Sequence, residues 1–337
     1  MSNQSVLMLA GDVGGTKTNL AVFAREEGLR RPLAEASFVN REYPHFTAVI
    51  RDFLKEHPLP VKHGAIGAAG PIVKGRVDVT NLPWQIDAKE LMEALNFQSI
   101  TLLNDLVAFA GAVPVLEEED VLTLNAGAAE PTGPMAVIAP GTGLGEAYLT
   151  WAAGAYHTHP SEGGHTDFAP RNEKEMALLR FLQKQYDHVS YERICAGIGV
   201  PNVYRFAAQT AGLPSDDDVW KEVNAATDAT PVIIREGMKD GGCPVCREAL
   251  RLFVSILGAE AGNLALKVLA TGGVYIGGGI PPRILPLLRE PGFLKGFQEK
   301  GRFTDTMKKM PLHVILNPKV ALMGAARSGW QQLDFPS

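Results

Sequence analysis

The sequence has few cysteines, no block of basic residues and no long apolar run, and each scarcity excludes a class of protein. Three cysteines suit a reducing compartment. The 32 basic and 37 acidic residues leave a net charge of −5 without a basic cluster, so we expect no nucleic-acid partner. Because no uninterrupted apolar stretch reaches the ~20 residues that a bilayer requires, we also expect no membrane association.

The start of the chain carries no leader pattern, because residues 1–5 are polar and a strand follows at once. We therefore expect a cytoplasmic protein. With 46% apolar residues over 337 positions, the chain is long enough for about two domains, each with a sizeable core. Cys243 and Cys246 have the spacing of a redox or zinc pair, but no second Cys/His pair lies at ligand spacing. We interpret the two cysteines as structural.

Two distant segments share one layout, an apolar strand, a Gly/Thr turn and a second apolar strand. The first spans Val6–Phe23 and the second spans Met135–Leu149. Glycines in such turns let backbone N–H groups surround an anion, because no Cβ blocks the approach and a positive φ costs little. The sequence therefore predicts two phosphate-binding hairpins, with a nucleotide held between two lobes.

The first turn is close to a P-loop but differs from it in two ways. Thr16 stands where a P-loop has its second glycine, and residues 19–23 have a strand pattern where a P-loop opens into a helix. We therefore predict a hairpin with a tight turn at Gly14–Gly15, where Thr16 offers donors to phosphate. A carboxylate facing polyphosphate needs a cation between them, so Asp12 is a candidate indirect ligand for Mg²⁺. The alternative for this hairpin alone is an ordinary turn with a solvated aspartate.

Between the hairpins and after them, strand and helix patterns alternate, which predicts a mixed sheet covered by helices. A long buried helix is predicted over 247–270, because its apolar residues recur every three or four positions. It leads into a strand and a glycine turn over 272–281, which suits close approach of a nucleotide. A polar stretch, 215–228, is predicted to be a surface loop and helix. The other predicted strands are 34–39, 65–71, 100–103 and 313–316, and the other predicted helices are 47–56, 106–111, 282–288 and 320–330.

Asp105 is the first candidate for chemistry, because it follows a buried strand and starts a helix. Ligands in open α/β sheets lie beyond the carboxyl ends of the strands, so this carboxylate is expected to point toward a ligand. The helix N-terminus is expected to keep it ionised, as a proton acceptor requires. The alternative is a helix cap without a catalytic role.

Three further polar clusters suit the binding of a hydroxylated ligand. In Glu162–His165, two glycines let a carboxylate and an imidazole face one ligand, and the lack of further ligands nearby favours sugar over zinc. Tyr191–Arg193 heads a predicted helix, with Glu192 as either a ligand contact or a surface charge. Thr80–Trp84 is a turn carrying an amide and an aromatic ring, as at a carbohydrate-contacting edge or in a plain structural turn.

Taken in order, these motifs resemble the bacterial glucokinase family over nearly the whole chain. The most specific piece is the run from Glu162 to Pro170. The resemblance implies an α/β fold of the hexokinase, actin and heat-shock ATPase type, in which two ribonuclease-H-like lobes close over ATP and sugar. We place the small lobe at 1–110 plus 318–337 and the larger lobe at 111–317. The motifs that carry the resemblance are Gly11–Thr16, Thr80–Trp84, Leu103–Asp105, Pro140–Gly145, Glu162–Pro170, Tyr191–Arg193 and Gly277–Gly279.

The resemblance implies a glucokinase, an ATP:hexose 6-phosphotransferase that converts glucose to glucose 6-phosphate for glycolysis. It implies ATP and Mg²⁺ as cofactors, with Asp12 holding Mg²⁺ through water, and Asp105 as the base for the 6-hydroxyl. The implied sugar contacts are Asn81, Asn104, Asp105, Glu162, His165 and Glu192. The implied nucleotide contacts are Gly11, Asp12, Val13, Gly14, Gly15, Thr16, Gly141, Thr142, Gly143, Gly277 and Gly278.

Other functions on the same fold remain open. One is a kinase for another hexose, such as mannose, fructose or an amino sugar, because the fold fixes the phosphate site and not the sugar pocket. A noncatalytic sugar or nucleotide sensor and a chaperone-like ATPase are the other classes. Lys17–Asn19 resembles the related repressor and sugar-kinase family, but 162–195 holds one cysteine and no helix-turn-helix precedes Val6. We therefore expect neither zinc nor DNA binding, and we leave a homodimer open.

Overall fold

The computed structural model describes residues 5–214 and 216–335. The chain divides into two compact units. The first contains residues up to Glu117, residues 157–160 and the segment from Asn317 onward, and the second contains residues 118–156 and 161–316. Each unit has its own sheet and its own hydrophobic core.

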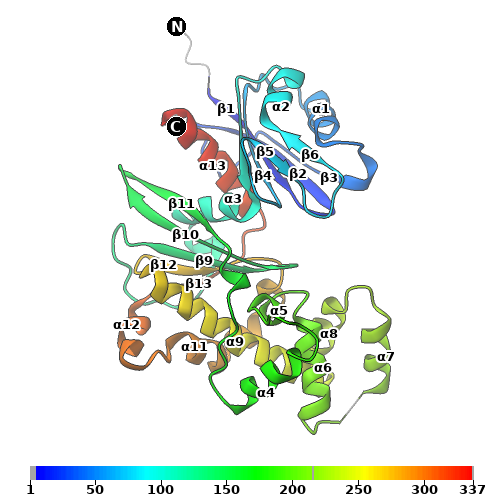
Figure 1. Cartoon of the computed structure of the whole chain (residues 1–337). Coiled ribbons are helices and arrows are strands. Elements are labelled where there is room, and N and C mark those ends of the chain that lie inside the picture. Colours follow the sequence, from blue (N-terminus) through cyan, green and yellow to red (C-terminus); the bar gives the residue numbers. More distant parts are fainter. Residues whose placement is uncertain (1–4, 215, 336–337) are drawn as a thin grey trace. The chain divides into compact units, whose positions relative to one another are not determined.

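The sheet of the first unit has the strand order β3-β2-β1-β4-β7 (Figure 1). The strands β1, β4 and β7 run parallel, whereas β2 returns antiparallel to β1 through the first glycine turn. Parallel strands end at the same edge of a sheet, so the segments that follow β1, β4 and β7 lie together. The bounds are β1 Leu7–Val13, β2 Lys17–Ala24, β3 Ala34–Val39, β4 His63–Ala68 and β7 Ser99–Asn104.

Alternation along β1 explains why this sheet is covered on both faces. Leu9 and Val13 belong to the core beneath α1 (Phe46–Glu56) and α2 (Ala88–Leu95), whereas Met8 and Ala10 face α3 (Asp105–Gly111) and α13 (Val320–Asp334). Successive side chains of a strand point to opposite faces, so an unbroken apolar strand needs a helical layer on each. A small hairpin, β5 (Arg76–Asp78) and β6 (Gln85–Asp87), completes the unit.

The helices α3 and α13 pack very closely in the first unit. A Cβ on Gly324 would stand 1.8 Å from the carbonyl oxygen of Ala108, and one on Gly111 would stand 3.1 Å from the carbonyl oxygen of Gly324. Glycine at both positions therefore lets the two backbones meet.

The sheet of the second unit has the order β11-β10-β9-β12-β13-β8. The strands β9 and β10 form the second hairpin, with Leu144 opposite Pro140, and β12 runs parallel to both β9 and β13. The bounds are β8 Val121–Asn125, β9 Met135–Pro140, β10 Leu144–Ala152, β11 Ala155–Ser161, β12 Gly273–Ile276 and β13 Leu312–Ile315.

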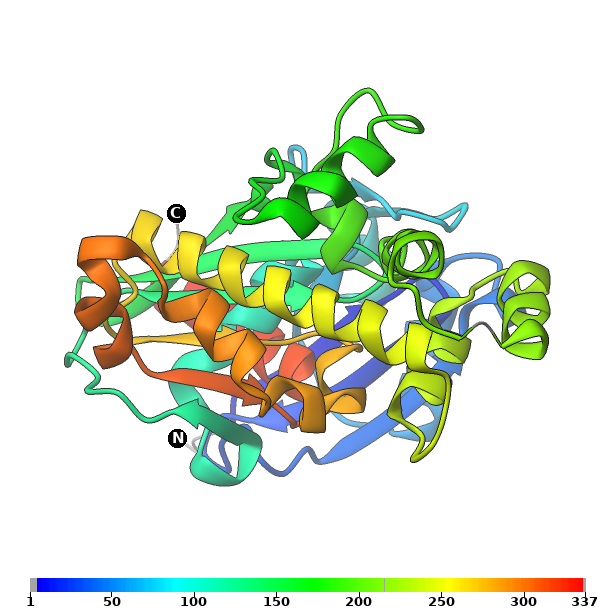
Figure 2. The same ribbon diagram turned by 90° about the horizontal axis from the view of Figure 1, so that it is seen from below.

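The helix α9 (Pro244–Val268) runs across one face of this sheet beside α11 (Pro291–Gln298) (Figures 1 and 2). Among the described residues, α9 alone is long and apolar enough to cross a membrane, but 78% of its most apolar window is buried inside the structure. It is therefore the core helix of the unit. The remaining helices are α4 Glu173–Leu182, α5 Glu192–Cys195, α6 Val200–Thr210, α7 Asp217–Ala225, α8 Thr230–Met238, α10 Leu285–Leu288 and α12 Thr304–Lys309, with short 3₁₀ turns between some elements.

Most predicted elements are confirmed with small shifts at their ends. The strand pattern after the first turn is confirmed as β2, which rules out a P-loop there. The helix predicted over 282–288 is wrong as one element, because it divides into a 3₁₀ turn, Pro281–Arg283, and α10. Pro286 cannot donate a backbone hydrogen bond, and its ring would clash with the carbonyl group four residues earlier. Within the predicted stretch 215–228, residue 215 lies outside the described residues and the helix is α7.

Candidate functional site

Two carboxylates approach each other at the parallel-strand edge of the first unit. Asp12 lies on β1 opposite Asn19, which donates a hydrogen bond to it at 3.2 Å. Burial raises the pKa of Asp12, the hydrogen bond from Asn19 opposes that shift, and the charge of Asp105 adds to it. The two carboxylates therefore interact, since the parallel strands β1 and β7 end at the same edge of the sheet on either side of β4.

Asp105 is the first residue of α3, with Asn104 as the cap. The Asn104 Oδ1 atom accepts hydrogen bonds from the backbone N–H groups of Leu106 and Val107, at 3.0 and 3.3 Å. Asp105 accepts one from the N–H of Leu106 at 2.9 Å. Burial raises the pKa of Asp105, and these hydrogen bonds only oppose the shift, so the net direction is opposite to that expected from a helix N-terminus.

Asn40 fixes the turn of the first hairpin from outside. Its side chain donates to the carbonyl oxygen of Gly14 at 2.8 Å and accepts from the Thr18 hydroxyl at 2.8 Å. Gly15 and Thr16 are exposed at the tip. Gly11 is buried inside β1, where a Cβ would stand 2.7 Å from the Ile66 side chain, so packing accounts for this glycine. The side chain of Val13 is also fully buried, and its backbone lies between β2 and β4, opposite Thr18 and Ala68.

The 80–84 turn presents its amide but not its aromatic ring. Asn81 is exposed and has a left-handed backbone, with φ of 65°, and its Cβ would be 3.8 Å from a Cβ placed on Gly15. Trp84 is only 3% exposed and packs near Phe46, with ring centroids 6.4 Å apart. Of the two alternatives for this turn, the ring therefore fits the structural one, because this indole belongs to the core under α1.

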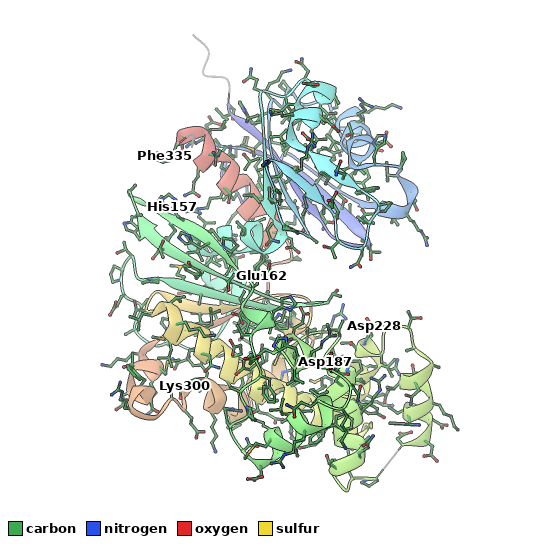
Figure 3. The ribbon with its side chains drawn as sticks, in the orientation of Figure 1. His157, Glu162, Asp187, Asp228, Lys300 and Phe335 are labelled. Carbon is green, nitrogen blue, oxygen red and sulfur yellow. The ribbon has the colours of Figure 1, made fainter. Side chains whose placement is uncertain are left out.

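The second unit brings its three predicted sugar contacts together. Glu162 follows β11 (Figure 3). His165 ends the 3₁₀ turn after it. The His165 ring lies between two carboxylates, with Nε2 3.9 Å from Glu162 Oε2 and Nδ1 3.9 Å from Glu192 Oε1. The side chains of Glu162 and His165 are 90% and 60% exposed, whereas that of Glu192 is 17% exposed. Two carboxylates and an imidazole thus present several hydrogen-bonding atoms on one surface.

Glu192 also holds the second hairpin. Its Oε2 atom accepts a hydrogen bond from the backbone N–H of Leu144 at 2.9 Å. The turn after α5 adds two backbone bonds, from Gly197 to the carbonyl of Gly141 at 2.8 Å and from Ile198 to that of Thr142 at 3.2 Å. The segment that carries Glu192 is therefore tied to the glycine turn of the hairpin at three points.

The glycine turn after β12 lies against the same hairpin. The N–H of Gly277 donates to the carbonyl of Ile138 at 2.8 Å, and that of Ile280 donates to Pro140 at 3.2 Å. Gly278 has a φ of 83°, and a Cβ there would stand 2.4 Å from the Pro140 oxygen. Positive φ and close backbone contact both require glycine at this position.

Comparison with known proteins decides the family. A model of the glucokinase family matches residues 9–332. A glucokinase from a Nostoc species is 38% identical to this chain over 335 residues, which cover 95% of this chain and 98% of that protein. The chain belongs to the glucokinase family. This family is one of sugar kinases, so the sugar kinase class predicted from the motifs is confirmed.

Solved structures agree with this family assignment. A glucokinase from an Antarctic psychrotroph has a TM-score of 0.83 at 30% identity and covers 97% of this chain and 100% of its own. A glucokinase of the ROK family from Streptomyces griseus, solved with glucose and AMPPNP, has a TM-score of 0.65 at 18% identity, covering 96% of this chain and 99% of its own. The second likeness concerns the fold alone. The predicted two-lobed α/β fold is confirmed for this glucokinase-family chain.

The surroundings of Asp12 bear on whether a cation could lie beside it. Across residues 5–214 and 216–335, no group of three or more His, Cys, Asp or Glu side chains is arranged to hold a metal ion. Burial and, to a lesser extent, the charge of Asp105 raise the pKa of Asp12, and a cation near Asp12 would offset both effects. A Cβ placed on Gly15 would meet only the Asn81 Cβ, at 3.8 Å, and one placed on Gly141 would meet nothing within 4 Å, so both turns are open at these positions.

Sequence reasoning missed the residues that support this site in the glucokinase-family chain. Asn40 follows β3 and is separated from the Gly14 turn by 26 positions, with no motif to mark it. Glu146 lies at a buried position of β10, the strand after the second turn, among mostly apolar residues. An acidic residue at a buried strand position is the one signal that could have singled it out.

Proposed function

We propose that this chain is a glucokinase that transfers the γ-phosphoryl group of ATP to the 6-hydroxyl of D-glucose. The observation that carries the proposal is the placement of Glu192, which faces His165 with one carboxylate oxygen and holds the second glycine hairpin with the other. A sugar kinase must hold a sugar hydroxyl close to a phosphate group, and Glu192 joins the proposed hydroxyl-binding cluster to the proposed phosphate-binding turn. The glucose bound in two solved glucokinases of similar fold, one of them the Streptomyces griseus protein, supports glucose as the sugar. We propose a cytoplasmic enzyme whose product enters glycolysis.

Asp105 is proposed as the general base. Its carboxylate takes the proton of the 6-hydroxyl while that oxygen forms a bond to the γ-phosphorus and the bond from phosphorus to the ADP oxygen breaks. Burial raises the pKa of Asp105, which makes the carboxylate a better proton acceptor than a solvated aspartate. The Leu106 N–H and the Asn104 cap hold it in one orientation.

The phosphate groups of ATP are proposed to meet two kinds of turn. In the first unit the proposed contacts come from residues 11–16, with Gly15 and Thr16 exposed at the tip of the turn, and in the second from residues 141–143 and 277–278. Mg²⁺, when bound, neutralises charge on the phosphate oxygens, and Asp12 is proposed to hold it through water. Asn19 orients Asp12 for that task by a hydrogen bond to one carboxylate oxygen.

The sugar is proposed to be bound mainly by carboxylates and amides. A carboxylate accepts hydrogen bonds from two neighbouring sugar hydroxyls, and charge-assisted bonds are roughly twice as strong as neutral ones. Glu162, His165 and Glu192 supply such groups from the second unit, and Asn81 and Asn104 supply amides from the first. Because phosphoryl transfer needs little covalent chemistry from the protein, this positioning accounts for much of the rate.

The test is a coupled assay of ADP release with Mg-ATP and, in turn, glucose, mannose, fructose, glucosamine and N-acetylglucosamine. We expect turnover with glucose, little without sugar, and a loss of most turnover in Asp105→Asn with glucose binding retained in calorimetry. The matched control is Asp52→Asn, an exposed aspartate on α1. Turnover only with another sugar would assign that sugar as the substrate in place of glucose. ATP hydrolysis that does not depend on sugar would refute the kinase activity, and near-normal turnover of Asp105→Asn would refute Asp105 as the general base.

A further inference from the structure

Two buried glutamates of the second unit lie behind the proposed sugar-binding surface. Glu146 on β10 is 1% exposed, and Glu260 on α9 is 0% exposed. Among the described residues, neither Glu146 Oε1 nor Glu260 Oε1 has a hydrogen-bond partner. The Nζ atom of Lys267 is 3.6 Å from Glu260 Oε1. Burying a lone carboxylate costs several kcal/mol, so such a pair stays in a core only when a proton or a fixed neighbour compensates its charge.

Glu146 touches the loop that carries Glu162 and His165. A Cβ placed on Gly163 would stand 1.8 Å from Glu146 Oε2, so the carboxyl group packs directly on the backbone of that glycine. The N–H of Gly163 is held by the Ser161 hydroxyl at 3.0 Å. The position of the Glu146 carboxyl group therefore sets how closely the loop approaches β10.

Glu260 reaches the other proposed sugar-binding segment through Asn263. The Asn263 amide donates to Glu260 Oε2 at 2.9 Å and to the Tyr191 hydroxyl at 3.0 Å. The orientation of the Asn263 side chain is fixed, because its amide oxygen accepts a hydrogen bond from Lys300 Nζ at 2.6 Å. Lys300 lies on the segment that follows α11 (Figure 3). Tyr191 directly precedes Glu192.

The protonation of Glu146 follows from its surroundings. Burial and then the charge of Glu260 raise the pKa of Glu146 to about 8, and Lys267 opposes the shift. Near neutral pH this carboxyl group is therefore mostly a neutral acid. The titratable and charged groups that interact with Glu146 or Glu260 come from three parts of the unit and are Lys267 on α9, Tyr191 and Cys195 at α5, and Lys300 after α11.

We propose that Glu146 is a positioning residue for sugar binding, which in its neutral form packs beside Glu260 and holds the Glu162–His165 loop and the Tyr191–Glu192 turn in place. Ionisation of Glu146 would place two carboxylates together in the core, and the loop is the nearest part that can move away. This inference rests on the proposed function for its kinetic readout, but the loop's position can be measured without any substrate.

The kinetic test compares the full chain with Glu146→Gln, which keeps the shape and cannot ionise. If glucose binds only when Glu146 is neutral, the glucose KM of the unmodified chain rises up to about tenfold from about pH 7 to about pH 9. Glu146→Gln keeps a low glucose KM over that range, and the KM for ATP does not follow the difference. Lys300 also has a pKa of about 8, lowered chiefly by burial. Because Lys300 is present in both proteins, its contribution to the pH dependence of the KM cancels in the comparison.

The structural test is amide hydrogen exchange of peptides covering 161–166 and 191–195, without ligands. Comparing both proteins at one pH removes the intrinsic pH dependence of exchange. We expect equal protection at about pH 7 and a loss of protection at about pH 9 in the unmodified chain alone. The control is Glu93→Gln, an exposed glutamate on α2, which should behave as the unmodified chain.

The outcomes separate this inference from the proposed function. If no sugar supports turnover, the proposed function fails and the exchange experiment still decides the role of Glu146. Equal exchange in both proteins at both pH values, or an unchanged rise of glucose KM in Glu146→Gln, overturns the inference. If Glu146→Gln does not fold, Glu260→Gln removes the same carboxylate pair and is tested in the same way.

Discussion

Alanine substitutions at two glycines of the second hairpin, Gly141 and Gly143, should raise the KM values of different substrates. A Cβ on Gly143 would stand 2.5 Å from the Oε2 atom of Glu192, whereas one on Gly141 would meet nothing within 4 Å. Neither glycine has a positive φ, so alanine is compatible with both backbones. The perturbation we consider is therefore Gly143→Ala, with Gly141→Ala as its partner.

The size of the effect follows from the bond that Gly143→Ala breaks. The added methyl group displaces the Glu192 carboxylate from the Leu144 N–H, a 2.9 Å hydrogen bond to a charged group. Such a bond contributes about 1.5–3 kcal/mol, so we expect the KM for glucose to rise about 10- to 150-fold. The group displaced is the end of a side chain, so the fold should persist. Gly141→Ala instead narrows the space proposed for phosphate and should raise the KM for ATP.

The assay is steady-state kinetics with each substrate varied at saturating concentration of the other, together with thermal unfolding of each variant. Gly292→Ala is the control, since Gly292 is exposed on α11 and a Cβ there also meets nothing within 4 Å. An equal rise of both KM values in Gly143→Ala, with an unchanged unfolding temperature, would refute the assignment of Glu192 to the sugar.

Four other changes have definite expected results. Glu192→Gln should raise the KM for sugar more than that for ATP, and equal rises would indicate a structural role instead. Asp12→Asn should raise the Mg²⁺ concentration needed for half-maximal turnover, measured by Mg²⁺ titration at constant ATP, without changing the KM for glucose; an unchanged titration would exclude Asp12 from cation binding. Gly324→Ala should lower the free energy of unfolding by about 1–3 kcal/mol through overpacking against Ala108, measured by urea denaturation beside Gly292→Ala, whose Cβ meets nothing. The pKa of Glu146 is about 8 in the folded chain against an ordinary value of 4.5, so its contribution to stability is present below about pH 4.5 and is lost as pH rises toward 8. Glu146→Gln should remove this pH dependence of the free energy of unfolding, which is at most about 1.4 kcal/mol per pH unit. If the free energies of unfolding of the two proteins change in parallel with pH across that range, the prediction is contradicted.

The sequence predicted those parts of the molecule that depend on local patterns. The two hairpins follow from glycine spacing between apolar strands, and Asp105 follows from the junction of a strand with a helix. The place of Trp84 could not be predicted, because a turn pattern does not tell which of its side chains faces a core. The break before α10 was missed, although Pro286 marks it.

The supporting contacts of the site could not be predicted because they join distant segments. Asn40 reaches Gly14 only because β2 and β3 pair. Glu146 and Glu260 are 114 positions apart by their numbers, and only the packing of α9 near β10 makes them interact. The raised pKa of Asp105 likewise depends on burial, which the helix-terminus argument does not contain.

The return of α13 to the first unit has a consequence for biosynthesis. The face of the sheet that carries Met8, Ala10 and Phe23 is covered by α3 and α13, and α13 follows the whole second unit in the chain. Roughly 200 residues separate these two helices, and a ribosome adds about 5–20 residues per second. The apolar face therefore remains without α13 for roughly 10–40 s after α3 is made. During this interval the second unit can fold while the apolar face of the first unit still lacks one of its two covering helices.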